Sequence, residues 1–147
     1  MKHYKLFSAA TMLCMIAFFT MSWAPSPTAT PAPVKSTPVR IIATFTDVST
    51  PTLFTGTFTT SGALNISGNA IMVISDNANG KRAHCVLTLT ASDGTGTITI
   101  HQQCQFATVP PKGRWEIASG TGAYWDLKGN GSLLMPGNDE DMTGVIY

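Results

Sequence analysis

The chain has little charge and no cluster of basic residues. Charged residues make up 12% of its 147 residues, with nine Lys and Arg against eight Asp and Glu. Without residues 1–24, seven basic residues remain against eight acidic ones, for a net charge of −1. Nucleic-acid binding needs a positively charged face. We therefore predict no nucleic-acid partner.

The motifs of common enzymes are also missing. No Gly-x-Ser-x-Gly elbow of a hydrolase occurs, and no His-x-His, Cys-x-x-Cys or His-Glu-x-x-His spacing supplies metal ligands. The Gly-x-Gly pairs neither begin a helix nor precede Lys-Ser/Thr, as phosphate-binding loops require. We predict no metal, no cofactor and no catalytic residue, although an enzymatic activity stays open.

Isolated polar residues have simpler interpretations. His84 and His101 are expected on the solvent face of strands, because no third ligand accompanies them. The carboxylates of Glu116 and Asp126 are the kind that glycosidases use as a pair, but alternation with apolar neighbours indicates that Glu116 faces solvent. The acidic run 138–141 lacks the spacing of a calcium loop and is interpreted as a solvated turn.

The N-terminus is typical of an export signal. Basic residues precede an uncharged run at 6–23, and the small residues Ser22 and Ala24 fit a cleavage site. Pro25 is unfavourable after such a site, and the run is long enough to span a bilayer. We predict a secreted or periplasmic protein with a signal at 1–24. The alternative is an uncleaved membrane anchor with the domain outside.

Residues 25–38 form the next segment. Five prolines in fourteen residues exclude a helix or an inner strand and predict an extended linker. The remaining 109 residues, 39–147, are enough for one domain.

This domain is predicted to be all-β. Thr, Val, Ile and Phe recur with period two, no convincing helix pattern occurs, and Gly, Pro, Asn and Asp punctuate the gaps. Many short strands without sequence repeats indicate a sandwich or a barrel. The expected strands are 39–48, 53–64, 70–76, 83–90, 96–106, 113–118, 123–128, 131–136 and 142–147.

The two cysteines of this domain suggest one disulfide. If Leu89 lies opposite Ile100 in a hairpin, Cys85 lies opposite Cys104, and His84 and His101 share the other face. An exported chain favours the bridge over two buried thiols.

Residues 114–132 hold the strongest local signal. Gly120, Gly122, Gly129 and Gly131 are predicted to form bends between strands. The aromatic residues between and before them, Trp115, Tyr124 and Trp125, are the candidates for binding a small ligand; core packing is the alternative.

The stretch Gly113–Ser132 resembles a motif of small exported bacterial β proteins, Gly-x-Trp-x-Ile-x-x-Gly-Thr-Gly-x-Tyr-x-x-Leu-x-Gly-x-Gly. Its glycine core is also similar to that of the allene oxide cyclase and dirigent-like barrels. The resemblance covers about Thr55–Tyr147 and implies an antiparallel closed barrel of about eight strands. No catalytic residue of those barrels falls on a matched position here.

Three functions follow from this interpretation. The first is a non-enzymatic module that binds a small apolar or aromatic ligand inside the barrel. The second is a cyclase or isomerase of the allene oxide cyclase or dirigent-like kind. The third is a structural domain whose barrel is filled and which acts through its outer surface. Oligomeric state is left open.

Overall fold

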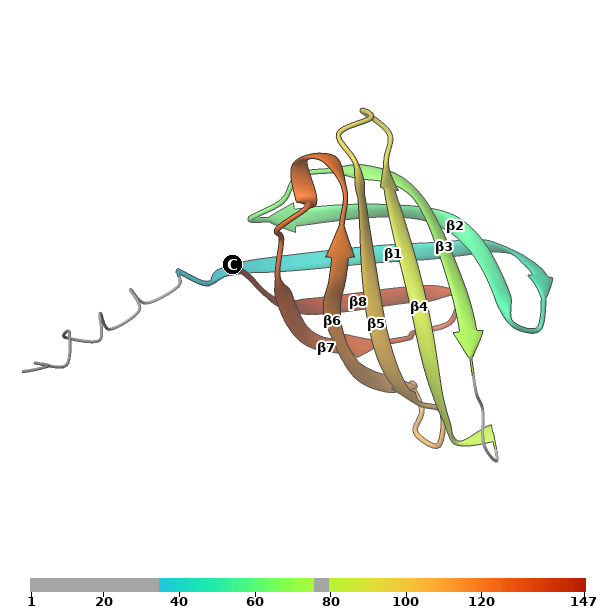
Figure 1. Cartoon of the computed structure of the whole chain (residues 1–147). Helices are drawn as coiled ribbons and strands as arrows, with labels where there is room; N and C mark the ends of the chain where they lie inside the picture. The colour runs from blue at the N-terminus through green and yellow to red at the C-terminus, as the bar shows by residue number, and fades with distance from the viewer. Residues whose placement is uncertain (1–34, 76–79) are drawn as a thin grey trace, which may run out of the picture. The chain divides into compact units, whose positions relative to one another are not determined.

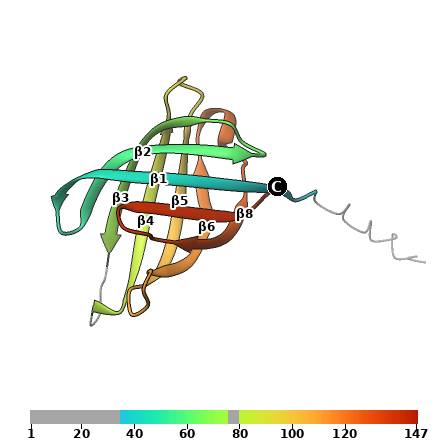
Figure 2. The ribbon, with the colours of Figure 1, turned by 180° about the vertical axis from the view of Figure 1, so that it is seen from behind.

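The computed structural model describes residues 35–75 and 80–147, which form a closed antiparallel barrel (Figure 1). Each strand pairs with the next along the chain, and the last pairs with the first, as the view from behind also shows (Figure 2). The strands are β1 (Thr37–Thr50), β2 (Leu53–Gly62), β3 (Ser67–Ser75), β4 (Arg82–Ala91), β5 (Thr97–Gln105), β6 (Lys112–Gly120), β7 (Gly129–Leu134) and β8 (Asp139–Ile146).

The predicted fold class is confirmed, but one expected strand is wrong. Residues 123–128 form no strand; a short 3₁₀ helix, η2 (Gly122–Tyr124), and a turn occupy this position. Positive φ at Gly122 turns the chain away from the sheet, and the amide of Leu127 donates to the Tyr124 carbonyl. The apolar residues here cover the end of the barrel instead of extending its wall.

The domain begins slightly earlier than expected. The predicted signal (1–24) and most of the predicted linker (25–38) lie outside the described residues, but Thr37 and Pro38 belong to β1. A proline is tolerated at the start of a strand, where its missing N–H costs little. The described residues contain no helix that is long and apolar enough to cross a membrane.

The register of the cysteine hairpin was predicted wrongly by two residues. Cys85 lies opposite Gln102 and not opposite Cys104, because the ladder continues to the Thr90–Thr97 pair and the turn is shorter than expected. A shift of two residues keeps each side chain on its predicted face. Both cysteines therefore point into the barrel, as expected.

The centre of the barrel is filled by side chains. Trp115 of β6 is buried, and its indole lies over two glycines, Gly131 of β7 and Gly144 of β8, which are paired with each other. A Cβ on Gly131 would lie 2.8 Å from the Trp115 Nε1 atom. The Trp115 N–H donates to the carbonyls of Ser132 (3.1 Å) and Thr143 (3.3 Å). Trp115 is thus a core residue that locks three strands together.

The two ends of the barrel differ. We call the end formed by 63–66, 92–96 and 121–128 the closed end, and the end formed by 51–52, 106–111 and 135–138 the open end. In Figure 1 the β4–β5 turn and η2 lie at the top, and the β5–β6 loop lies at the bottom.

Candidate functional site

Two Gly-Thr-Gly segments interlock at the closed end. The Thr97 amide donates to Thr121 Oγ1 (3.0 Å), and the Thr121 amide donates to the Thr97 carbonyl (2.9 Å). Gly96 and Gly122 allow this approach, because a Cβ on either would overlap backbone atoms of the other segment. The turns thus hold each other through backbone contacts.

Tyr124 completes this closure. Its side chain is buried, and its hydroxyl lies 2.6 Å from Thr95 Oγ1. Thr95 Oγ1 in turn lies 2.6 Å from a carboxylate oxygen of Asp93, which also accepts the Thr95 amide. These hydrogen bonds from the Thr95 side chain and backbone lower the pKa of Asp93. Every polar group in this chain of contacts has a partner.

The three aromatic residues proposed for binding do not converge on one site. Trp115 lies in the core, Tyr124 plugs the closed end, and Trp125 is 73% exposed. The glycines divide as well. Gly120 ends β6 and Gly122 begins η2, so both lie at the bend between them, whereas Gly129 and Gly131 lie inside β7 and form no turn. They are glycines because β8 and inward side chains approach too closely for a Cβ.

An apolar cavity of about 340 Å³ enters the barrel at the open end. We call it the mouth. This volume lies at the lower end of the range for small-molecule sites. Phe45 and Phe54 meet edge to face there, with ring centres 6.1 Å apart. The residues that line the mouth are Phe45, Val48, Phe54, Met72, Ile74, Phe106, Pro111, Met135, Gly137, Asn138, Asp139 and Glu140.

Glu140 is the one buried charged residue among those described. It is 1% exposed, lines the mouth, and neither carboxylate oxygen has a hydrogen-bond partner among the described residues. Burial raises the pKa of Glu140 to about 7, and the Gln102 amide, which lies near the carboxylate without reaching hydrogen-bond geometry, opposes part of this rise. The carboxyl group can therefore take up or release a proton near neutral pH.

The sequence prediction for this residue was wrong. The acidic run 138–141 was interpreted as a solvated turn, but only Asp139 and Asp141 point outward: Asp139 accepts a hydrogen bond from Thr44 Oγ1 (2.8 Å), and Asp141 accepts two from Arg40. The signal was present in the alternation of 139–146, because Glu140 shares a face with Met142.

Further polar groups lie deeper than Glu140. Gln102 of β5 is buried, and its Nε2 donates to the sulfur of Met142 (3.5 Å), two residues along β8 from Glu140. Gln102 Oε1 has no partner among the described residues. A thioether sulfur only accepts hydrogen bonds. This contact therefore assigns Nε2 to the side of Met142 and leaves Oε1, with the second N–H of Nε2, for other partners.

Cys85 lies opposite Gln102, and both Cys85 and Cys104 are free thiols, with their Sγ atoms 3.6 Å apart. The predicted disulfide is absent from the structure. Contact with Cys85, burial and the charge of Glu140 all raise the pKa of Cys104. Cys104 is therefore the poorer nucleophile of the pair, whereas contact with Cys104 lowers the pKa of Cys85.

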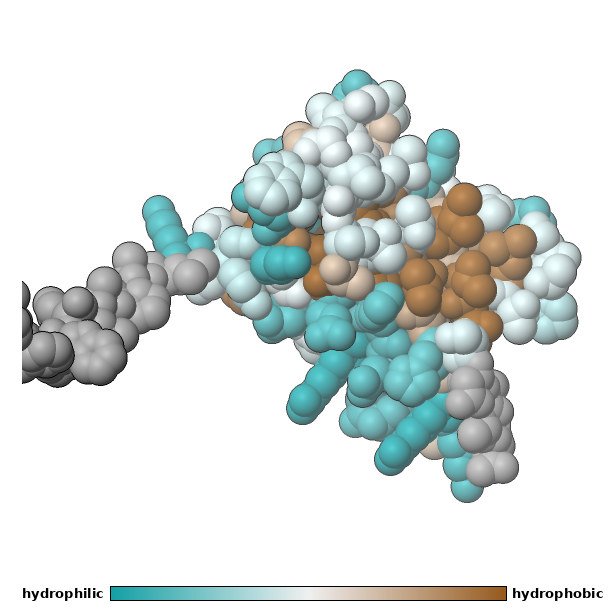
Figure 3. All heavy atoms as spheres, viewed as in Figure 1, coloured by the Kyte–Doolittle hydropathy of each residue, from teal (hydrophilic) through white to brown (hydrophobic). Residues whose placement is uncertain are grey.

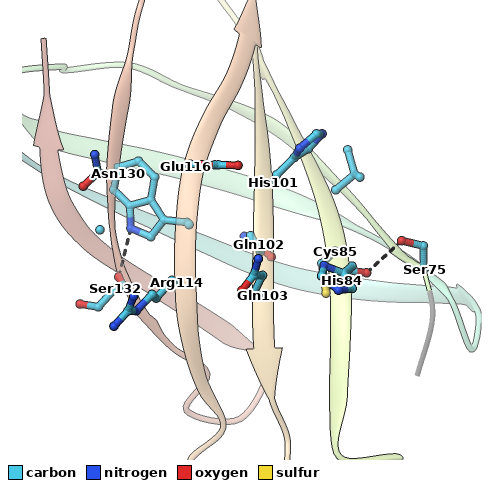
Figure 4. A pocket seen from close by; sticks show the side chains of 13 residues that line it. Ser75, His84, Cys85, His101, Gln102, Gln103, Arg114, Glu116, Asn130 and Ser132 are labelled. Carbon is cyan, nitrogen blue, oxygen red and sulfur yellow. Dashed lines mark hydrogen bonds between the residues drawn. The ribbon is translucent and has the colours of Figure 1, made fainter. Parts of the chain in front are cut away.

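The outer face carries a second hollow, of about 750 Å³, across β4 to β7 (Figure 4). Its side chains form two cross-strand rows: His84, Gln103, Arg114 and Ser132, and His101, Glu116 and Asn130. All seven residues come from strand positions that face outward, so the histidines lie on the solvent face, as predicted. None of these groups is desolvated, and Asp126 is exposed in the turn before β7.

Apolar side chains lie next to this hollow. Ile71 and Val73 of β3 are each 44% exposed, and Figure 3 shows an apolar area on this face beside the polar one. Among the described residues, no group of three His, Cys, Asp or Glu side chains is placed to hold a metal ion.

Comparison of the chain with protein-family models, curated proteins and solved structures finds no match. The barrel that the resemblance to allene oxide cyclase and dirigent-like proteins implied is present. Any shared activity stays a prediction, and the site must be interpreted from its own residues.

Proposed function

We propose that the protein is a binding module that takes a small, mostly apolar molecule into the mouth of its barrel. The observation that carries this proposal is the pairing of an apolar lining with one buried, unpartnered carboxyl group, Glu140. Ligand sites combine a mainly apolar wall with a few polar groups that fix orientation. The polar side chains across the outer hollow are exposed to solvent, and the described residues of the closed end include no buried side-chain oxygen or nitrogen without a partner.

A second candidate function is an isomerase or cyclase that works by proton transfer. The pKa of Glu140, raised to about 7 by burial, favours it, because a general acid or base works best when its pKa lies near the operating pH. Glu140 is the one buried ionisable group among the described residues that line the mouth, however, so binding alone is the simpler proposal.

The proposal places the domain outside the cell. It rests on the basic start, the apolar run and the small residues of 1–24, and on the even number of cysteines in 39–147. In that setting the module would hold an apolar ligand that is poorly soluble in water.

Two tryptophan variants test binding in the mouth. Ile74→Trp fills the mouth, whereas Val73→Trp adds the same side chain to the outer face one residue away. The full chain is titrated with the neutral fluorophore N-phenyl-1-naphthylamine, and far-ultraviolet circular dichroism confirms that each variant folds. We expect saturable binding by the wild type and Val73→Trp, and at least a tenfold loss in Ile74→Trp. Equal binding by all three proteins would contradict the proposal.

A further inference from the structure

When Glu140 is ionised, the unpartnered polar atoms inside the barrel are all hydrogen-bond acceptors. Among the described residues they are Gln102 Oε1 and both carboxylate oxygens of Glu140. Buried polar groups normally have partners, and leaving one without a partner costs free energy. Three acceptors in one apolar interior are therefore an unusual set that a ligand with donors would complete.

The described part of the protein supplies no cationic donor for them. Gln102 and Glu140 are its only buried polar or charged side chains, so no Lys, Arg or His reaches this interior. One of the two Gln102 amide N–H groups is used by Met142, and the Trp115 N–H is used by two backbone carbonyls. The remaining donors near Glu140 are uncharged: the second amide N–H of Gln102, the weak thiols of Cys85 and Cys104, and the amide of Asn138 in the lining of the mouth.

Other charges face away from Glu140. Asp139 lies at the rim of the mouth and is bonded to Thr44 on the outer face. Asp141 is held outside by Arg40, with a nitrogen–oxygen distance of 2.7 Å. The thiols of Cys85 and Cys104 are the titratable groups packed near the carboxyl group from β4 and β5. An organic cation would therefore meet a single acidic group without a competing protein cation.

A primary ammonium group matches this set of atoms. It carries three donors and no acceptor. A charge-assisted hydrogen bond to a carboxylate is stronger than a neutral one, and it is strengthened further where water is excluded. The rings of Phe45, Phe54 and Phe106 leave an apolar wall for the rest of such a molecule.

We propose that the ligand of the mouth is a small amine with an apolar body, bound with its ammonium group at Glu140. This inference rests on the proposed function and names its ligand class. The bound ion pair requires the ionised form of Glu140. Binding therefore strengthens as the pH rises through about 7 and weakens above about 10, where an alkylammonium group loses its proton.

Three ligands of equal chain length separate the head group from the apolar body. Hexylamine, hexanol and hexanoate are each titrated into the full chain at pH 8 by isothermal calorimetry. The variants are Glu140→Gln, which removes the charge in the mouth, and Glu116→Gln, which makes the same change on the outer face. Circular dichroism confirms folding of both.

We expect the wild type and Glu116→Gln to bind hexylamine at least tenfold more tightly than hexanol, with hexanoate weakest. Glu140→Gln should lose that preference and still bind hexanol. Equal affinities for all three ligands, or an amine preference that survives in Glu140→Gln, would overturn the inference and leave apolar binding in place. Failure of every ligand, together with failure of the naphthylamine probe, would overturn the proposed function itself.

Discussion

The closed end and the open end of the barrel treat their polar groups in opposite ways. At the closed end, Thr95, Thr121 and Tyr124 are joined to one another or to backbone across two turns. At the open end, Glu140 and the deeper Gln102 have oxygen atoms without partners. The same strands lead to both ends, so the difference arises from the turns and from a few inward residues.

We therefore assign stability to the closed end of the barrel and binding to its open end. At the closed end, the glycine turns pack backbone against backbone so closely that even a Cβ atom would not fit between them. The open end keeps a cavity of about 340 Å³ and a desolvated carboxyl group, and burying that group without a partner is unfavourable. A binding site is expected where such an unfavourable group is retained.

The largest predicted effect comes from adding one methyl group at each end. Gly120→Ala places a Cβ on the Tyr124 carbonyl oxygen, so the bend must open and release several hydrogen bonds, at a cost of about 4 kcal/mol. Gly137→Ala at the open end meets no atom within 4 Å and costs about 1 kcal/mol through its positive φ alone. Urea unfolding measures both. Equal losses of unfolding free energy in the two variants would contradict this difference between the two ends.

The next effect is a dependence of stability on pH. Folding raises the pKa of Glu140 from 4.5 to about 7, so the folded state binds this proton more tightly than the unfolded state does. The stabilisation of the folded state by this proton is fully present below about pH 4.5 and is lost as the pH rises to about 7, which lowers the free energy of unfolding by about 3 kcal/mol. We expect Glu140→Gln to flatten urea-unfolding free energies between pH 5 and 8.

Glu116→Gln provides the control for this measurement, because it changes the same residue type on the outer face. Its pH profile should follow that of the wild type. A Glu140→Gln profile as steep as the wild-type one would show that the carboxyl group is not desolvated in the folded protein.

A smaller effect is expected from oxidation of the interior thiols. Since the Sγ atoms of Cys85 and Cys104 lie 3.6 Å apart, a small shift joins them, and we expect a disulfide in air-oxidised protein. The bridge should add about 2 kcal/mol to the free energy of unfolding. Peptide mass mapping identifies the bridge and distinguishes it from one to Cys14. Alkylation of both thiols after oxidation would contradict the prediction.

The smallest effect tests the hydrogen bond of the Tyr124 hydroxyl at the closed end. Tyr124→Phe removes the contact with Thr95 Oγ1 and keeps the ring, so we expect a loss of about 1 kcal/mol in thermal or urea unfolding. Binding of the naphthylamine probe at the other end should not change. A loss of binding in this variant would mean that the two ends are coupled.

The sequence predicted the wall of the barrel better than its ends. Alternation placed Cys85 and Cys104 inside and His84 and His101 outside, because period two survives even when the register is shifted by two residues. The register itself depended on the length of one turn, which Asp93 tightens by accepting two hydrogen bonds from Thr95. Such a contact is not visible in a pattern of hydrophobicity.

The candidate site was the least predictable part. Aromatic residues attracted the binding hypothesis, yet Trp115 and Tyr124 are buried as structural residues and Trp125 is exposed. Glu140 was missed because its two acidic neighbours made the run look solvated, although the period of β8 assigns it to the inner face. A buried acid becomes apparent only when alternation is given more weight than local charge.

The pairing of β1 with β8 has a consequence for the way the chain folds. Arg40 and Asp141, which join these strands on the outer face, are separated by 101 positions, and the sheet has no free edge once they meet. The other seven pairings join neighbours in sequence, and they can form as hairpins while the chain is still growing. The β1–β8 pairing can form only after the last strand has been synthesised. A chain shortened before β8 would therefore expose two unpaired edges, the kind of surface that recruits other chains into aggregates.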